Sequence, residues 1–191
     1  MLVLTLTGLE EATITKRPSK ICKSPYMADI ILTHDQDKQE TMAHSPSLGC
    51  SGLTDIGSKV LVSRTPLEKK DKIKSSHKIQ FSILSNPSNQ LVCTHPAVAE
   101  NVIEIALKNN MLRSLKVSKL QKQTTIGKSR FDFSGIDSDG KEFIAEVKTV
   151  PAAGRSDGGE EIIAFFPDGY IKSKDIGKKP QSERANKHIQ E

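Results

Sequence analysis

Residues 130–149 constrain the fold more than any other segment, because they read as a β-hairpin with one consistent register. Side chains alternate between the two faces of a strand. On the first strand Asp132 points away from its phenylalanine neighbours, and on the second an acid and a lysine alternate with apolar residues. The apolar set is Phe131, Phe133, Phe143, Ala145 and Val147. These side chains share one face only if Phe133 pairs with Ala145.

The length of the turn decides which faces coincide. A two-residue Asp-Gly turn would pair Asp132 with Val147 and mix the faces. A three-residue turn over residues 138–140, with Gly140 in the left-handed conformation, pairs Asp132 with Glu146 instead. Only this second register separates apolar from polar side chains, so we predict a bulged three-residue turn.

The polar face of this hairpin holds Asp132, Glu146 and Lys148. Burying two carboxylates and a lysine is costly unless they are paired. One interpretation is therefore an ion network within the protein. The other is a divalent cation held by both carboxylates and the Val147 carbonyl, with Lys148 stabilising the charge that develops in a reaction. The residues alone leave both interpretations open.

Glu104 is a further candidate metal ligand. It lies on a helix that we expect to begin at Pro96 and to end at Asn109-Asn110. Glu104 either adds a carboxylate to the site or forms an i,i+4 ion pair with Lys108.

The charge of the chain points to a polyanionic partner. The net charge is +5 and the pI is about 9.0. Six basic residues occur from Arg113 to Arg130 without an acid, which favours either a solvated basic face or contact with nucleic-acid phosphates. The candidates for that contact are Arg17, Lys20, Lys116, Lys119, Lys122, Lys128, Arg130, Lys187 and His188.

The expected fold class is mixed α+β, with two domains that meet near the turn-forming residues 85–90. Residues 1–86 contain short β-rich segments between Gly, Pro and Ser clusters, which predicts a small barrel of the oligonucleotide/oligosaccharide-binding (OB) type. Residues 87–191 predict an α/β domain. Strands are expected at residues 1–7, 28–33, 59–63, 78–84 and 162–166, and a last helix at residues 182–191.

The sequence also indicates where the protein works. No apolar run approaches the roughly 18 residues of a membrane span, and residues 1–7 read as a strand rather than a signal peptide. Cys22, Cys50 and Cys93 are far apart in the sequence. Three reduced thiols in an intracellular protein are the expected state.

Short motifs follow one another along nearly the whole chain. They include Lys16-Arg-Pro, Tyr26-Met-Ala-Asp, Ala43-His-Ser-Pro, Gly57-Ser-Lys-Val-Leu-Val-Ser-Arg, Ser129-Arg-Phe-Asp-Phe, Ala145-Glu-Val-Lys-Thr, Ala164-Phe-Phe-Pro-Asp and Ser182-Glu-Arg-Ala-Asn-Lys-His. In this order they resemble the sugar fermentation stimulation protein (SfsA) family. The resemblance implies an OB-like domain followed by a domain similar to PD-(D/E)xK nucleases.

The resemblance also implies roles for single residues. By position, Asp132 and Glu146 match metal ligands, Lys148 the catalytic lysine and Glu104 the acid of the preceding helix. It implies a DNA-binding protein with phosphodiester hydrolysis dependent on Mg²⁺ or Mn²⁺, and so a deoxyribonuclease. The alternative is a non-catalytic nucleic-acid-binding or regulatory protein that keeps the nuclease fold.

Three features depart from the family pattern. Ser-Pro-Ser-Leu-Gly-Cys-Ser at residues 45–51 stands where Asn-Thr-Gly-Ser-Met is expected after His-x-Pro. Residues 172–179 form a basic insertion. The chain ends at Glu191 whereas family members continue with further strand and helix, so a truncated or divergent member is expected.

Overall fold

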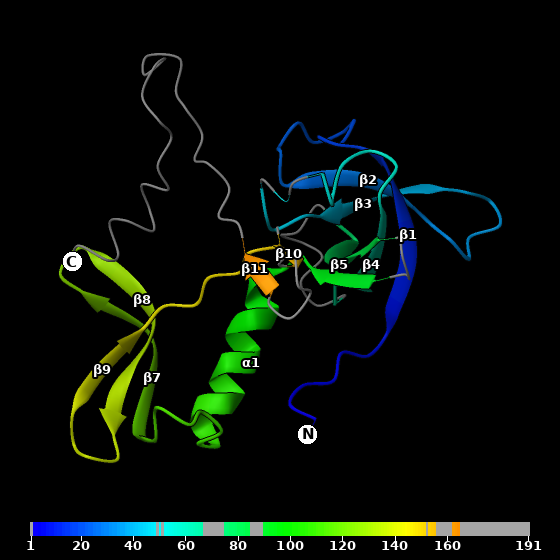
Figure 1. Ribbon diagram of the computed structural model, residues 1–191. Coiled ribbons are helices and arrows are strands. Elements are labelled where there is room, and N and C mark those ends of the chain that lie inside the picture. The colour runs from blue at the N-terminus through cyan, green and yellow to red at the C-terminus, as the bar shows by residue number, and fades with distance from the viewer. Residues whose placement is uncertain are drawn as a thin grey trace. The chain divides into compact units, whose positions relative to one another are not determined.

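The structure is a computed structural model (Figure 1) that describes residues 2–48, 50, 52–66, 75–84, 90–151, 153–155 and 162–164, the last two ranges by their backbone alone. The chain divides into two compact units, Met1–Val102 and Ile103–Glu191. The sequence predicted a first domain of residues 1–86. The architecture is rich in β-sheet, and the described residues include one helix.

The first unit contains β1 (Leu9–Lys16), β2 (Met27–Leu32), β3 (Glu40–His44), β4 (Lys59–Arg64), β5 (His77–Leu84) and β6 (Gln90–Cys93). The strands predicted at residues 28–33, 59–63 and 78–84 are confirmed as β2, β4 and β5. The strand predicted at residues 1–7 is wrong, because residues 2–7 form no strand and the first one begins at Leu9. Leu2 is exposed, so the alternating pattern before Gly8 has no buried face to stabilise it.

The strands of the first unit follow the order β3-β2-β1-β4-β5-β6. Neighbouring strands in this order are antiparallel. In addition, β3 pairs in parallel with β5, through Ala43 with His77 and His44 with Lys78. This extra pairing joins the two ends of the five-strand run from β3 to β5.

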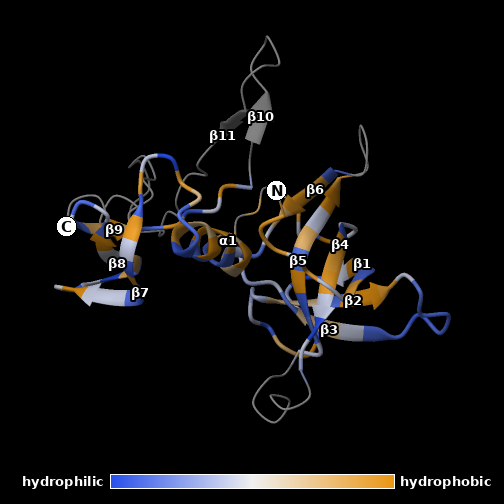
Figure 2. Cartoon of the chain, turned by 90° about the horizontal axis from the view of Figure 1, so that it is seen from below, coloured by the Kyte–Doolittle hydropathy of each residue, from blue (hydrophilic) through white to orange (hydrophobic). Residues whose placement is uncertain are grey.

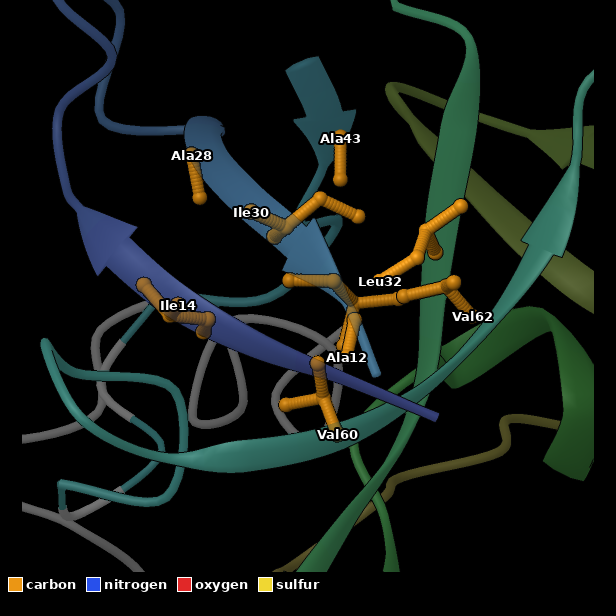
Figure 3. Close-up of a cluster of buried hydrophobic side chains, with 9 residues drawn as sticks. Ala12, Ile14, Ala28, Ile30, Leu32, Ala43, Val60 and Val62 are labelled. Carbon is orange, nitrogen blue, oxygen red and sulfur yellow. The ribbon is translucent and has the colours of Figure 1, made fainter. Parts of the chain in front are cut away.

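The core of the first unit lies between these strands. Its buried residues come from alternate positions of β1 to β5, as expected for strands with one inward face. Figure 3 shows their side chains pointing toward one another. The cluster consists of Ala12, Ile14, Ala28, Ile30, Leu32, Ala43, Val60, Val62 and Ile79. Each fully buried valine or isoleucine contributes about 1.5–3 kcal/mol.

Helix α1 (Pro96–Lys108) confirms the predicted helix and its ends. His95 caps its start, since the ring Nδ1 accepts a hydrogen bond from the Ala97 amide at 3.2 Å and the His95 carbonyl accepts one from Val98 at 3.0 Å. At the other end Asn110 takes a positive φ of 52° and Met111 bonds back to the Ala106 carbonyl. The helix therefore begins and ends where the capping residues allow.

The second unit adds two sheets. Strands β7 (Val117–Ile126), β8 (Ser129–Asp137) and β9 (Glu142–Ala145) form an antiparallel sheet in chain order. Figure 2 colours much of β7 in blue and white, in keeping with its polar sequence. Gly135 lies where β7 approaches closely, because an added Cβ would lie 2.0 Å from the Lys119 carbonyl oxygen.

Strands β10 (Ala153–Arg155) and β11 (Ile162–Ala164) form a separate antiparallel pair. Strand β11 lies within the strand predicted at residues 162–166, and the helix predicted at residues 182–191 lies outside the described residues. No helix in the described part of the chain is long and apolar enough to cross a membrane. The three cysteines are free thiols, as predicted.

Candidate functional site

The turn between β8 and β9 has the length that was predicted by placing the apolar side chains of the hairpin on one face. The amide of Asp137 donates to the Lys141 carbonyl at 2.8 Å, so the loop consists of the three residues between them. The Gly140 amide donates to the Asp137 carbonyl at 3.2 Å, and Gly140 has a φ of +80°. An L side chain rarely adopts this φ, which explains the glycine. The predicted bulged turn is confirmed.

The register of the hairpin is also confirmed. Phe133 pairs with Ala145, and Phe131 and Phe133 are buried. Their exposed fractions are 6% and 0%. Ile144, on the opposite face, is 51% exposed. The hairpin therefore separates its apolar face from the face that carries Asp132.

Three of the predicted site residues meet on the polar face. Asp132 Oδ2 accepts a hydrogen bond from the Val147 amide at 2.8 Å, and the Asp132 amide donates to Glu146 Oε2 at 3.3 Å. Lys148 Nζ forms an ion pair with Glu146 Oε1. The side chain of Glu146 is 20% exposed and that of Lys148 39%, so the cluster is open to solvent.

Glu104 lies outside this cluster of carboxylates and binds two lysines. Its Oε1 accepts from Lys108 Nζ at 2.6 Å and its Oε2 from Lys122 Nζ at 2.5 Å. Lys122 also lies 5.9 Å from the centre of the Phe133 ring. The hydrogen bond from Lys108, and then that from Lys122, lower the pKa of Glu104. The ion pair with Lys108 was one of the two interpretations of Glu104.

These ion pairs predict a pH-dependent contribution of Glu104 to stability. Because its pKa in the folded state is lowered from 4.5, the stabilisation is present above pH 4.5 and is lost as the pH falls through the folded pKa. We expect Glu104→Gln to lower the free energy of unfolding by about 0.5–1 kcal/mol at pH 7. Urea unfolding at several pH values measures this difference. A difference from wild type that stays constant down to pH 3 would contradict the assignment, and Glu142→Gln, at an exposed glutamate, is the control.

The donor chemistry of the hairpin fits a hard divalent cation. Such ions take oxygen ligands, and Mg²⁺ often binds through one or two carboxylates while it keeps several waters. Asp132, Glu146 and the carbonyl of Val147 provide such a set. In the described part of the chain, no group of three or more His, Cys, Asp or Glu residues is arranged to hold a metal ion. A cation here would thus rely on two carboxylates and would compete with Lys148 for Glu146.

Several residues predicted to bind nucleic acid are engaged by the protein itself. The Arg17 guanidinium donates to the carbonyls of Pro25, Ser47 and Thr54, at 3.0, 2.9 and 3.1 Å. Lys20 pairs with Glu40 at 2.5 Å.

In the second unit the predicted basic residues fall into three groups. Lys116 Nζ donates to the Asn110 carbonyl at 2.6 Å, and Lys122 binds Glu104. Lys119, Lys128 and Arg130 are exposed on or beside β7 and β8. Lys187 and His188 lie outside the described residues.

The ion pair of Lys148 with Glu146 is a contact of the ion network that the sequence left open as one interpretation of the polar face. The sequence reasoning missed the contact of Lys122 with Glu104 and Phe133. That contact had no local signal, because it depends on which residue of β7 lies opposite Phe133.

The strand pairing and the acidic hairpin define a sheet-rich mixed protein with a two-carboxylate candidate site. The family model for the sugar fermentation stimulation protein RE domain matches residues 97–191. Together with the relatives below, this match shows that the chain belongs to the SfsA family.

Of three similar proteins, two match nearly all of this chain and the third matches more than half of it. A sugar fermentation stimulation protein homologue of Clostridium tetani is 27% identical over 187 residues, which cover 96% of this chain and 67% of that protein. The Clostridium novyi homologue is 25% identical over 94% of this chain and 66% of its own length. The Shouchella clausii homologue is 32% identical over 57% of this chain and 40% of its own length. The chain thus spans at most about two thirds of these relatives.

A solved structure shares the fold. The structure of Pyrococcus furiosus SfsA in complex with Ca²⁺ matches with a TM-score of 0.68 and 13% sequence identity. The match covers 100% of this chain and 68% of that one. At this identity the likeness shows the fold alone.

Proposed function

We propose that this chain is a DNA-binding protein with a nuclease-type, divalent-metal-dependent phosphodiesterase site on the β8–β9 hairpin. The meeting of Asp132, Glu146 and Lys148 on one face carries the proposal. Membership of the SfsA family supports it, as does the Ca²⁺ complex of the Pyrococcus furiosus relative. The second unit is then a PD-(D/E)xK nuclease-like domain.

The first unit, in this proposal, is an OB-like barrel. Its pairings run β1 with β2, β2 with β3, β3 with β5, β5 with β4 and β4 with β1, which closes a ring of five strands. Such small barrels commonly bind oligonucleotides. The ring closure supports the assignment because it removes the free edges of the five strands.

The residues of the hairpin would divide the chemistry among them. Mg²⁺ or Mn²⁺, held by Asp132, Glu146 and the Val147 carbonyl, would supply charge neutralisation for the scissile phosphate. The hydrogen bond from the Val147 amide fixes the orientation of the Asp132 carboxylate. The Lys148 ammonium stabilises negative charge that develops on the phosphate.

The DNA backbone would lie along exposed basic residues of the same unit. Lys119, Lys128 and Arg130 are exposed and therefore available for phosphates. Lys122 and Lys116 are held by protein acceptors, so they contribute to the positive electrostatic potential rather than to direct phosphate contacts. Binding is expected to weaken with salt, because each phosphate contact releases counterions.

A second candidate is a non-catalytic nucleic-acid-binding protein. The observation that favours it is that the two carboxylates already have partners within the chain, the Val147 amide for Asp132 and the Lys148 ammonium for Glu146. In that case the triad is an ion network, and DNA binding does not depend on metal.

An incubation with single- and double-stranded DNA separates the two candidates. The chain is purified and tested with Mg²⁺, with Mn²⁺ and with EDTA. We expect cleavage with either cation and binding alone with EDTA. Binding that is equal in all three conditions, without cleavage of either substrate, would support the non-catalytic protein instead.

Metal binding can be tested apart from cleavage by Asp132→Asn. Asparagine keeps an oxygen that accepts the Val147 amide but lacks the charge that a cation needs. A cation at 100 times its Kd should raise the free energy of unfolding of the wild type by about 2.7 kcal/mol, and we expect this gain to vanish in Asp132→Asn. Thermal unfolding with Mn²⁺ and with EDTA measures it. Asp139→Asn, at an exposed turn position, is the matched control and should keep the gain.

A further inference from the structure

An aromatic pair lies on the first unit, whereas the acidic hairpin belongs to the second. The rings of Tyr26 and His44 are stacked, with centroids 6.5 Å apart and planes inclined by 26°. Strand pairing fixes the pair, because Met27 lies opposite His44 and the Ser45 amide donates to the Tyr26 carbonyl at 2.8 Å. Tyr26 is 42% exposed, so one side of the pair is available to a ligand.

The connection that carries Tyr26 is held in place from within the protein. Arg17 donates from Nε to the carbonyl of Pro25, next to Tyr26, and from its other nitrogens to the carbonyls of Ser47 and Thr54. The guanidinium thus ties the β1–β2 connection to the segment that follows β3. Arg17 is therefore a positioning residue for Tyr26, which differs from the phosphate contact that the sequence predicted.

Basic residues flank the pair. Lys23 is exposed on the β1–β2 connection, three residues before Tyr26, whereas Lys16 ends β1 and Lys20 pairs with Glu40. Lys78 of β5 pairs with His44 of β3. Burial, and then the charge of Lys78, lower the pKa of His44. Both effects favour the neutral form of the His44 ring, which is stacked with Tyr26.

We propose that Tyr26, backed by His44, is a stacking site for an unpaired nucleobase, and that the first unit binds single-stranded nucleic acid there. Bases stack on aromatic side chains beside a basic groove in proteins that bind single strands, whereas the bases of a duplex already stack on one another. In OB barrels, strands 2 and 3 and the loop between strands 1 and 2 contact oligonucleotides. The inference rests on the proposed function only in that the ligand is a nucleic acid. It requires neither the metal nor Asp132.

The chain offers a direct optical test. It has no tryptophan and two tyrosines, Tyr26 and Tyr170. In a Tyr170→Phe chain the tyrosine fluorescence therefore comes from Tyr26. Titration in EDTA with an oligothymidylate of about 12 nucleotides, a length within the range of one OB barrel, is expected to quench this emission. An abasic oligomer of equal length carries the same phosphates and is expected to bind more weakly without quenching.

Substitutions separate stacking from electrostatics. Tyr26→Ala is expected to weaken oligothymidylate binding roughly 5- to 150-fold, the range of one lost base stack. Tyr26→Phe keeps the ring and should bind as the wild type does. Leu91→Ala, which removes another exposed apolar side chain of the same unit, is the matched control and should change nothing. Equal losses for DNA and RNA oligomers would show that the base, not the sugar, is recognised.

The outcomes distinguish this inference from the proposed nuclease. Tyr26 emission that oligothymidylate does not quench, equal quenching by the abasic oligomer, or unchanged affinity for oligothymidylate in Tyr26→Ala would each overturn the stacking site. None of these results depends on cleavage, because EDTA is present throughout. A chain that shows the quenching but never cleaves DNA would overturn the proposed nuclease and keep the stacking site.

Discussion

Replacing Lys148 with alanine is expected to slow DNA cleavage about 100- to 1000-fold, the usual effect of removing one group that stabilises transition-state charge. The same substitution should tighten the binding of a divalent cation. Lys148 forms an ion pair with Glu146 Oε1 in the structure, and a cation bound by Glu146 has to displace it. The rate of plasmid cleavage in saturating Mg²⁺ and calorimetric titration with Mn²⁺ measure the two effects.

Opposite changes in rate and metal affinity are what separate a catalytic lysine from a structural one. Lys141→Ala is the matched control, because Lys141 is an exposed lysine at the other end of the same hairpin. Neither quantity should change in that variant. If Lys148→Ala binds the cation more tightly and cleaves at the wild-type rate, Lys148 is a counter-ion of Glu146, and its catalytic role is excluded.

The hairpin could be predicted from the sequence because two independent local constraints agree. Turn chemistry requires a residue that tolerates positive φ, and Gly140 meets that requirement. The requirement that the apolar side chains of both strands share one face then leaves one register, in which Phe133 pairs with Ala145. The helix from Pro96 was predictable for the same reason, since its capping residues and its apolar spacing agree.

Other parts depend on contacts between distant residues, which local patterns do not encode. Residues 2–7 alternate well but form no strand, whereas β1 pairs with both β2 and β4. The bonds of Arg17 to three carbonyls connect segments 8 to 37 residues apart. Such a guanidinium looks like a phosphate ligand until the fold supplies its acceptors. The stacking of Tyr26 on His44 likewise required the register of β2 with β3.

Truncation of Phe133 to alanine should lower the free energy of unfolding by about 3–5 kcal/mol, the usual cost of removing a fully buried phenylalanine ring. Phe133 is 0% exposed, pairs with Ala145 and lies beside the Lys122 ammonium. A cavity there removes packing from the strand that carries Asp132. Urea unfolding followed by circular dichroism measures the loss, and hydrogen exchange of the β8 amides shows where it occurs.

Ile144→Ala is the control that makes this a test of register. Ile144 lies on the opposite face of the hairpin and is 51% exposed. Its truncation should cost within about 0.5 kcal/mol, as for most surface substitutions. A slip of β9 by one residue would place Ile144 on the same face as Phe133 and bury it. Equal losses of unfolding free energy, or a larger loss for Ile144→Ala, would contradict the register. A slipped register would also turn Asp132 away from Glu146. This stability measurement therefore tests the geometry of the candidate site without any assay of cleavage.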